Sequence, residues 1–326
     1  MPGNPEVRII IAGKFSNCFS LDAMSGYFQQ MAMIREIDLT LAQELLPKRR
    51  RDGDKWSHGV ALLVAGSRGL CGAAAFAARA AYRVGCGYLR LALPNGVVEP
   101  VQQLAPEAVL LPMGKRDADF LDGSAVRSIL GEAKRVQGWA IGPGLSRHHE
   151  TQWMVRELMP LMGGRGVIDA DGLNALAGHL SLLKESEAEL ILTPHAGEWE
   201  RLFGEPLAEG GEQRAEQVST TAAQWGVTLI AKGATTWVGE PSGGVWRYKG
   251  ECSALAKAGS GDLLTGAILG FLVQGASVAD AARLGVWVHG RAGQIGGEQM
   301  TDYSLLPSEL AHFFPQAIQE LVASGQ

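Results

Sequence analysis

The chain has 326 residues, of which 46% are apolar and 19% charged, a balance typical of a folded protein rather than a disordered one. Its formal net charge is −5 and its pI about 5.8, so we do not expect a nucleic-acid binder. No apolar run approaches membrane-spanning length, and the four scattered cysteines form no CxxC pair, so we expect a cytoplasmic protein without membrane contact or disulfide framework.

The first 55 residues show no clear hydrophobic period. They are predicted to be a lead-in segment with one helix near residues 31–46, ending in a basic run at 48–52 that is typical of a solvated linker. Residues 56–326 are predicted to form a single domain.

From residue 59 onward, short apolar runs alternate with segments of helical spacing. Strands are predicted over residues 60–65, 88–93, 139–141, 166–169, 190–192 and 228–231. Helices are predicted over residues 73–84, 263–273 and 278–295. This alternation indicates an α/β fold of three α/β/α layers, with a central, mostly parallel sheet. In such sheets the ligand site lies beyond the carboxyl ends of the strands.

The strongest chemical signal is the segment KAGSGD at 257–262, which leads into an apolar helix. Its glycines let the backbone turn so that successive N–H groups point into one small volume, and the helix start adds partial positive charge. Such a site suits a transferring phosphoryl group. Asp262 then serves either as general base for a substrate hydroxyl or as a helix cap, and the preceding small residues favour the base.

Neither a GxxxxGK[ST] loop nor a GxGxxG loop after a strand occurs. The segment GSGDLLTG at 259–266 instead resembles the signature of the ribokinase-like superfamily, in its ADP-dependent NAD(P)H-hydrate dehydratase branch. Further segments resemble this family in the same order, namely VAGS at 64–67, IGPGL at 141–145, VIDADGLN at 167–174, LTPHAGE at 192–198 and AKGATT at 231–236. One departure is Ser146, where the family has a glycine.

The resemblance implies a ribokinase-like fold and a repair reaction. In that family the hydroxyl on a hydrated nicotinamide ring of NADH or NADPH (NADHX or NADPHX) is phosphorylated from ADP, or from ATP in some members, and loss of phosphate restores the double bond. It also implies Mg²⁺ and assigns roles to residues. In these roles Asp262 acts as base, and Gly259, Ser260 and Gly261 stabilise the phosphoryl group. The implied nucleotide contacts are Lys232, Gly233, Ala234, Thr235, Thr236 and Gly261. The implied hydrate contacts are Ala73, Gly144, His195 and Asp262.

Several polar residues allow two interpretations. His195 is either a structural hydrogen-bonding group or a contact to the hydrated cofactor. Glu198 either organises Mg²⁺ through water or sits at a helix start. Asp169 and Asp171 either make polar contacts near the phosphates or cap the next turn. Lys232 either contacts phosphate or is a solvated lysine at a strand end.

Two other functions compete with hydrate dehydration. One is a kinase of a small alcohol or vitamin precursor with the same fold, which keeps its phosphorylated product. The other is a nucleotide-binding regulatory module without turnover. The family resemblance further implies a homo-oligomer, and a separate epimerase protein in place of the fused epimerase domain of the bifunctional members.

Overall fold

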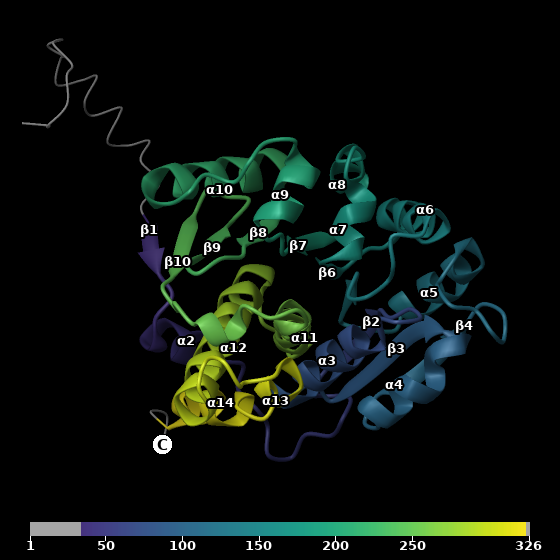
Figure 1. The fold of residues 1–326 in the computed structure, drawn as a ribbon, viewed down its shortest axis with the longest axis horizontal. Coiled ribbons are helices and arrows are strands. Elements are labelled where there is room, and N and C mark those ends of the chain that lie inside the picture. The colour runs from purple at the N-terminus through teal and green to yellow at the C-terminus, as the bar shows by residue number, and fades with distance from the viewer. Residues whose placement is uncertain (1–33, 324–326) are drawn as a thin grey trace, which may run out of the picture.

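The computed structural model describes residues 34–323, and within them the central feature is a ten-stranded sheet (Figure 1). The strands follow the order β1-β10-β9-β8-β7-β6-β5-β2-β3-β4. Their bounds are β1 Ile34–Glu36, β2 Val60–Val64, β3 Tyr88–Pro94, β4 Val109–Met113, β5 Gly138–Ile141, β6 Arg165–Ile168, β7 Glu189–Leu192, β8 Thr228–Ala231, β9 Thr236–Gly239 and β10 Val245–Tyr248. Neighbouring strands are parallel except at β9, which is antiparallel to both β8 and β10.

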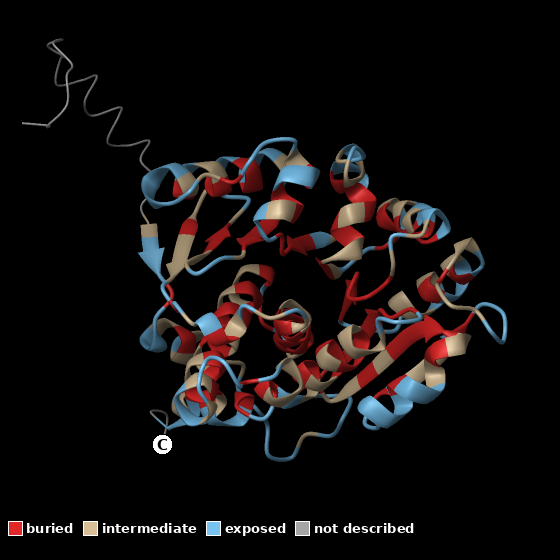
Figure 2. Ribbon diagram, in the orientation of Figure 1, coloured by how far each residue is buried: buried red, intermediate tan, exposed pale blue. Residues whose placement is uncertain are grey.

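Helices cover both faces of this sheet, and the buried residues gather between the layers (Figure 2). One face carries α2 Leu39–Leu45, α3 Cys71–Arg83, α4 Val98–Leu104, α11 Ser260–Val273, α12 Val278–Met300, α13 Pro307–Leu310 and α14 Phe314–Val322. The other carries α5 Val126–Ala133, α6 His149–Leu158, α7 Asp171–Leu176, α8 Ser181–Glu185, α9 Ala196–Phe203 and α10 Gly211–Trp225. The predicted three-layer architecture is confirmed.

Strand β2 shows why both faces are covered. Ala61 and Leu63 belong to one hydrophobic core, while Leu62 and Val64 belong to the other. A strand buried on both sides must be apolar at every position, which is why it appears in the sequence as a continuous apolar run. The six predicted strands and three predicted helices are all present, with ends that differ by a few residues.

The N-terminal prediction needs a correction. Of the helix expected over 31–46, residues 31–33 lie outside the described residues, Ile34–Glu36 form the edge strand β1, and the helix itself covers only Leu39–Leu45. Asp38 starts this helix, because its carboxylate accepts a hydrogen bond from the Leu41 N–H at 2.9 Å. The following basic run is exposed, as expected. The domain boundary at residue 55 stays a prediction.

Helix α11 lies unusually close to α3. A Cβ on Gly266 would meet the Ala77 carbonyl oxygen at 2.0 Å, and one on Gly270 would meet the Ala81 carbonyl oxygen at 2.7 Å. Only glycine fits at these two contacts. The pairing places the first turn of α11 beside the carboxyl ends of the parallel strands, where the ligand site is expected.

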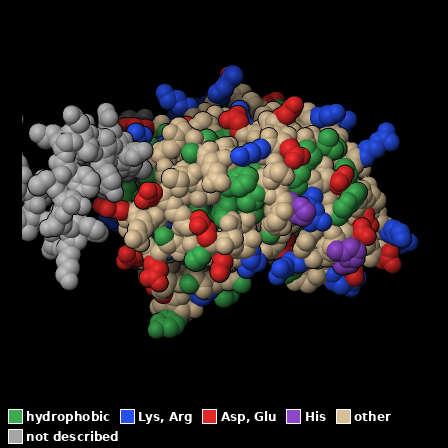
Figure 3. Space-filling model, turned by 90° about the horizontal axis from the view of Figure 1, so that it is seen from above, with side chains coloured by type: hydrophobic (Ala, Val, Ile, Leu, Met, Phe, Trp, Pro, Cys, Tyr) green, Lys and Arg blue, Asp and Glu red, His purple; other side chains and the backbone are tan. Residues whose placement is uncertain are grey.

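The distribution of charged side chains on the surface agrees with the small net charge of the chain. Acidic and basic side chains are interspersed on the face that Figure 3 shows. No helix within residues 34–323 is long and apolar enough to cross a membrane. The three cysteines that the structure describes, Cys71, Cys86 and Cys252, are free thiols.

Candidate active site

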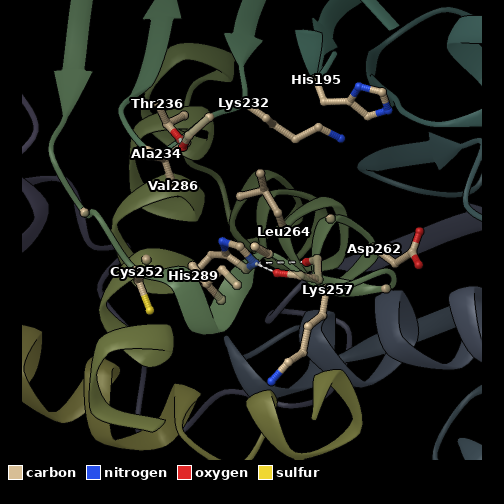
Figure 4. Close-up of a pocket in the computed structure, with 18 of the residues that line it drawn as sticks. His195, Lys232, Ala234, Thr236, Cys252, Lys257, Asp262, Leu264, Val286 and His289 are labelled. Atoms are coloured by element: carbon tan, nitrogen blue, oxygen red, sulfur yellow. Dashed lines mark hydrogen bonds between the residues drawn. The ribbon is translucent and has the colours of Figure 1, made fainter. Parts of the chain in front are cut away.

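A cavity of about 900 Å³ lies at the carboxyl edge of the sheet, between the ends of β6–β8 and the start of α11 (Figure 4). This volume is in the range of small-molecule and cofactor sites. In Figure 4, His195 and Lys232 extend from the strand side, and Asp262 lies on the opposite side at the helix start.

Most of the predicted site residues line this one cavity. They are His195, Glu198, Lys232, Gly233, Ala234, Thr236, Gly259, Ser260, Gly261 and Asp262. Thr235, Ala73 and Gly144 do not line it. Gly144 lies beside α3, where an added Cβ would come within 2.9 Å of the Ala73 side chain. The predicted roles of these residues stay predictions.

The segment 257–262, called here the phosphate turn, has a defined backbone geometry. The Ser260 N–H donates to the Lys257 carbonyl oxygen at 3.1 Å, and Gly259 adopts φ 99°, which suits the third position of a type II turn. No described residue accepts a hydrogen bond from the N–H groups of Gly259, Gly261 and Asp262. Free amides at a helix N-terminus bind anions. The Ser260 amide differs from expectation because it is used inside the turn.

His289 of α12 holds the far end of the phosphate turn. Its Nε2 lies 2.9 Å from the Ser260 carbonyl oxygen and 3.0 Å from Ser260 Oγ. Because a carbonyl oxygen only accepts, Nε2 carries the proton and Nδ1 does not. Burial lowers the pKa of His289 to about 4, so the imidazole is neutral near pH 7.

Asp169 organises the centre of the site. Its carboxylate accepts hydrogen bonds from Thr193 Oγ1 at 2.6 Å, Thr265 Oγ1 at 2.7 Å and Lys232 Nζ at 2.8 Å. Burial alone would raise the pKa of Asp169, but Lys232 and the donated hydrogen bonds hold it below its usual value. Burial alone would lower the pKa of Lys232, but Asp169 and Glu198 raise it. Both groups are therefore charged at neutral pH.

Asp262 is the carboxylate with the strongly shifted pKa. Burial, with repulsion from Asp169, raises it to about 7, although Lys232 acts in the opposite direction. No hydrogen bond joins the Asp262 side chain to another described residue, so the helix-cap interpretation finds no contact to support it. A carboxylate that titrates near neutral pH beside free amides is suited to remove a proton from a hydroxyl.

His195 and Glu198 form a reciprocal cap at the start of α9. His195 Nδ1 accepts from the N–H groups of Gly197 at 3.0 Å and Glu198 at 3.3 Å, and the His195 N–H donates to Glu198 Oε2 at 2.9 Å. His195 is therefore a structural hydrogen-bonding group, which was one of the two interpretations from the sequence. Its side chain is also 53% exposed at the cavity, and its Nε2 lies 3.5 Å from Glu198 Oε1. Lys232 Nζ lies 3.6 Å from Glu198 Oε2.

The backbone around Asp169 is tightly constrained. A Cβ on Gly142, at φ 135°, would lie 1.7 Å from the Asp169 carbonyl oxygen. Ala170 has φ 48° and ψ −117°, a conformation that costs free energy for any residue with a Cβ. Ser146, in place of the family's glycine, keeps a left-handed φ of 80°, and its N–H donates to Asp171 Oδ2 at 2.9 Å.

Sequence reasoning missed His289, Thr193 and Thr265 as members of the site. His289 lies in a long helix without any local motif, and its partner Ser260 is 29 positions away in the sequence. Thr265 belongs to the recognised signature, but its bond to Asp169 spans 96 positions. No pattern of local spacing reports such contacts.

The family model described as NAD(P)H-hydrate dehydratase matches residues 61–316. The chain is 37% identical over 276 residues to the bifunctional NAD(P)H-hydrate repair enzyme Nnr of Moorella thermoacetica. The matched region covers 85% of this chain and 52% of that relative. The chain therefore spans about half the length of such bifunctional relatives.

Two further matches come from Bacillus subtilis. The ADP-dependent (S)-NAD(P)H-hydrate dehydratase is 33% identical over 276 residues, which cover 83% of this chain and 93% of the relative. The crystal structure of the ADP/ATP-dependent NAD(P)H-hydrate dehydratase, co-crystallised with ATP and Mg²⁺, superposes with a TM-score of 0.76 at 29% identity, covering 89% of this chain and 99% of that one.

Proposed function

Because the chain belongs to the NAD(P)H-hydrate dehydratase family, we propose that it converts hydrated NADH and NADPH, in the (S) form, back to NADH and NADPH with ADP as phosphoryl donor. The observation that carries the proposal is the pairing of Asp262, whose pKa is raised to about 7, with the free amides of the phosphate turn. A base and an anion site next to each other are what hydroxyl phosphorylation requires.

The first half of the reaction is phosphoryl transfer. Asp262 takes the proton of the ring hydroxyl, and the resulting oxygen attacks the β-phosphorus of ADP while the bond from that phosphorus to AMP breaks. The N–H groups of Gly259, Gly261 and Asp262 donate to the oxygens of the transferring group, where negative charge is concentrated. Lys232, fixed between Asp169 and Glu198, supplies positive charge in the same cavity.

The second half is elimination. Phosphate leaves with the electron pair of its bond to the ring carbon, a neighbouring ring carbon loses a proton, and the double bond reforms. Phosphate is a far better leaving group than hydroxide, which is why the phosphorylation is needed. We place the hydrate near Asp262 and His195, and the nucleotide along Lys232, Gly233, Ala234 and Thr236.

Mg²⁺ fits this site as an ion that arrives with the nucleotide. Within residues 34–323 no cluster of three or more His, Cys, Asp or Glu side chains could hold a metal alone. However, Asp169, Glu198 and Asp262 all act on one ammonium, that of Lys232, which leaves excess negative charge. Mg²⁺ needs only one or two carboxylates beside phosphates and water, and Glu198 would hold it. When bound, the ion would offset the charge of the phosphates.

The decisive test is a donor-by-substrate matrix. Purified protein is incubated with chemically hydrated NADH or NADPH and with ADP or ATP, while the absorbance of the reduced nicotinamide is followed. We expect the absorbance to return and AMP and phosphate to appear when ADP is the donor. Phosphorylation of an alcohol without recovery of absorbance would instead identify a kinase, and nucleotide binding without any product would identify a regulatory module.

The biological setting is also a proposal. The free thiols of Cys71, Cys86 and Cys252 support a reducing compartment, so we place the protein in the cytoplasm. A homo-oligomeric state and a partner epimerase that supplies the (S) epimer stay predictions. Sedimentation of the purified protein tests the first, and activity on the (R) hydrate with and without added epimerase tests the second.

A further inference from the structure

The phosphate turn has to be rigid to be effective. Amides stabilise a transferring phosphoryl group only when they already point at it, because reorientation during the reaction costs much of the gain. Gly259 and Gly261 give the turn its shape, but glycine also has the most backbone freedom of any residue. Contacts from outside the turn must therefore fix it.

At one end of the turn, Lys257 makes three hydrogen bonds to a single loop. Its Nζ donates to the carbonyl oxygens of Asp302 at 3.1 Å, Tyr303 at 3.0 Å and Leu305 at 2.5 Å. In Figure 4 the Lys257 side chain points away from Lys232 and His195, toward the C-terminal helices. An ammonium has three N–H donors. All three are occupied, so Lys257 has none left for a phosphate.

The loop that receives Lys257, residues 301–306, is itself anchored. Leu305 is 1% exposed and belongs to the core, and Ser253 Oγ donates to the Asp302 carboxylate. The next helix, α13, starts at Pro307, which lies close enough that a Cβ on Gly259 would approach it to 3.3 Å. The 301–306 loop and α13 thus form a support on the side of the phosphate turn away from the strands.

We propose that Lys257 is a positioning residue whose ammonium, bound by three carbonyl oxygens of the 301–306 loop, holds the phosphate turn in the geometry that phosphoryl transfer needs. The proposal rests on the proposed function. Together with His289 at Ser260, it fixes the turn at both ends, and Lys257 acts on the reaction only through the backbone that it positions.

Lys257→Ala tests the proposal, because it removes three side-chain carbons and the nitrogen. We expect kcat to fall about 10- to 100-fold, with less than about 3-fold change in KM for ADP, since the amides remain present but lose their fixed direction. Added n-propylammonium replaces the deleted atoms and should restore a substantial part of kcat. The neutral n-propanol should not, because it cannot donate three hydrogen bonds.

Two variants serve as controls. Lys257→Met fills the space of the side chain without a donor, so we expect the same loss in kcat but no response to n-propylammonium. Lys184→Ala removes an exposed lysine of α8, on the other face of the sheet, and should match the wild type with and without the amine. If Lys257→Ala does not fold, Lys257→Met carries the test through its kcat at a wild-type melting temperature.

A second readout does not depend on turnover. Hydrogen exchange of the Ser260 amide, which is hydrogen-bonded inside the phosphate turn, should be faster in Lys257→Ala and return toward the wild-type rate with n-propylammonium. Wild-type kcat in a folded Lys257 variant, or a loss that the amine does not reverse in Lys257→Ala, would overturn the proposal. A wild-type protein without hydrate dehydration refutes the proposed function instead, and the exchange measurement still decides whether Lys257 fixes the turn.

Discussion

Asp262→Asn removes the proposed base while keeping the size of the side chain. General bases contribute about 10²- to 10⁴-fold, so kcat should fall by that factor. ADP affinity should change less than about 3-fold, because the amides of the phosphate turn bind phosphate without the carboxylate. For the wild type, kcat should rise as pH increases through about 7, where Asp262 loses its proton.

The same substitution has a calculable effect on stability. The pKa of Asp262 is raised from 3.8 to about 7 in the folded protein, so between these pH values the folded state binds the proton more tightly than the unfolded state. The free energy of unfolding therefore falls as pH rises from about 4 to about 7. Above about pH 7 the charged carboxylate lowers the free energy of unfolding by at most about 4 kcal/mol, because each unit of pKa shift corresponds to about 1.36 kcal/mol. Asparagine carries no such cost.

Urea denaturation of the wild type and Asp262→Asn at pH 5 and pH 8 measures this effect. The variant should gain stability relative to the wild type at pH 8 and much less at pH 5. Asp117→Asn, at an exposed site, is the matched control and should show the same small difference at both pH values. An Asp262→Asn difference that does not vary with pH would refute the argument that burial and neighbouring charge destabilise this carboxylate.

Three other substitutions probe the surroundings of the base. Lys232→Met removes the cation that lowers the pKa of Asp262, so the rise of kcat with pH should move to higher pH; an unmoved profile would contradict the assigned charge balance. Gly259→Ala should lower the free energy of unfolding by about 1–2 kcal/mol in urea denaturation, because φ is 99° and the added Cβ would meet Phe76 at 2.9 Å. An unchanged free energy of unfolding would show that the turn adapts to the added Cβ. Ala170→Gly should raise the free energy of unfolding by about 1 kcal/mol because it relieves the backbone at φ 48°, and a decrease would contradict that strain.

The sequence predicted the parts of the site that depend on local pattern. Glycines followed by Asp262 at the head of an apolar helix have a direct physical meaning, and β2 and β8 are apolar because both faces of the sheet are covered. These elements were therefore found with nearly correct limits. The antiparallel β9 was missed, because it is followed by a turn rather than by a helix.

The contacts that set the electrostatics were not predictable in this way. The pKa of Asp262 depends on Asp169, and the charge of Asp169 depends on Lys232, which is 63 positions further along the chain. The expectation that the Ser260 amide faces phosphate failed because Lys257 supplies an acceptor within the same turn. Such outcomes follow from folded geometry and not from residue spacing.

The glycine contacts between α11 and α3 have a consequence for motion. Where Gly266 and Gly270 bring one backbone against the other, the two helices cannot slide or separate without losing their closest packing. Helix α11 starts at the phosphate turn, and α3 starts beside Gly144, so we expect these two regions to keep a constant separation when ligands bind. Any movement that accompanies admission and release of ligands should therefore lie in the surrounding loops and not in this helix pair.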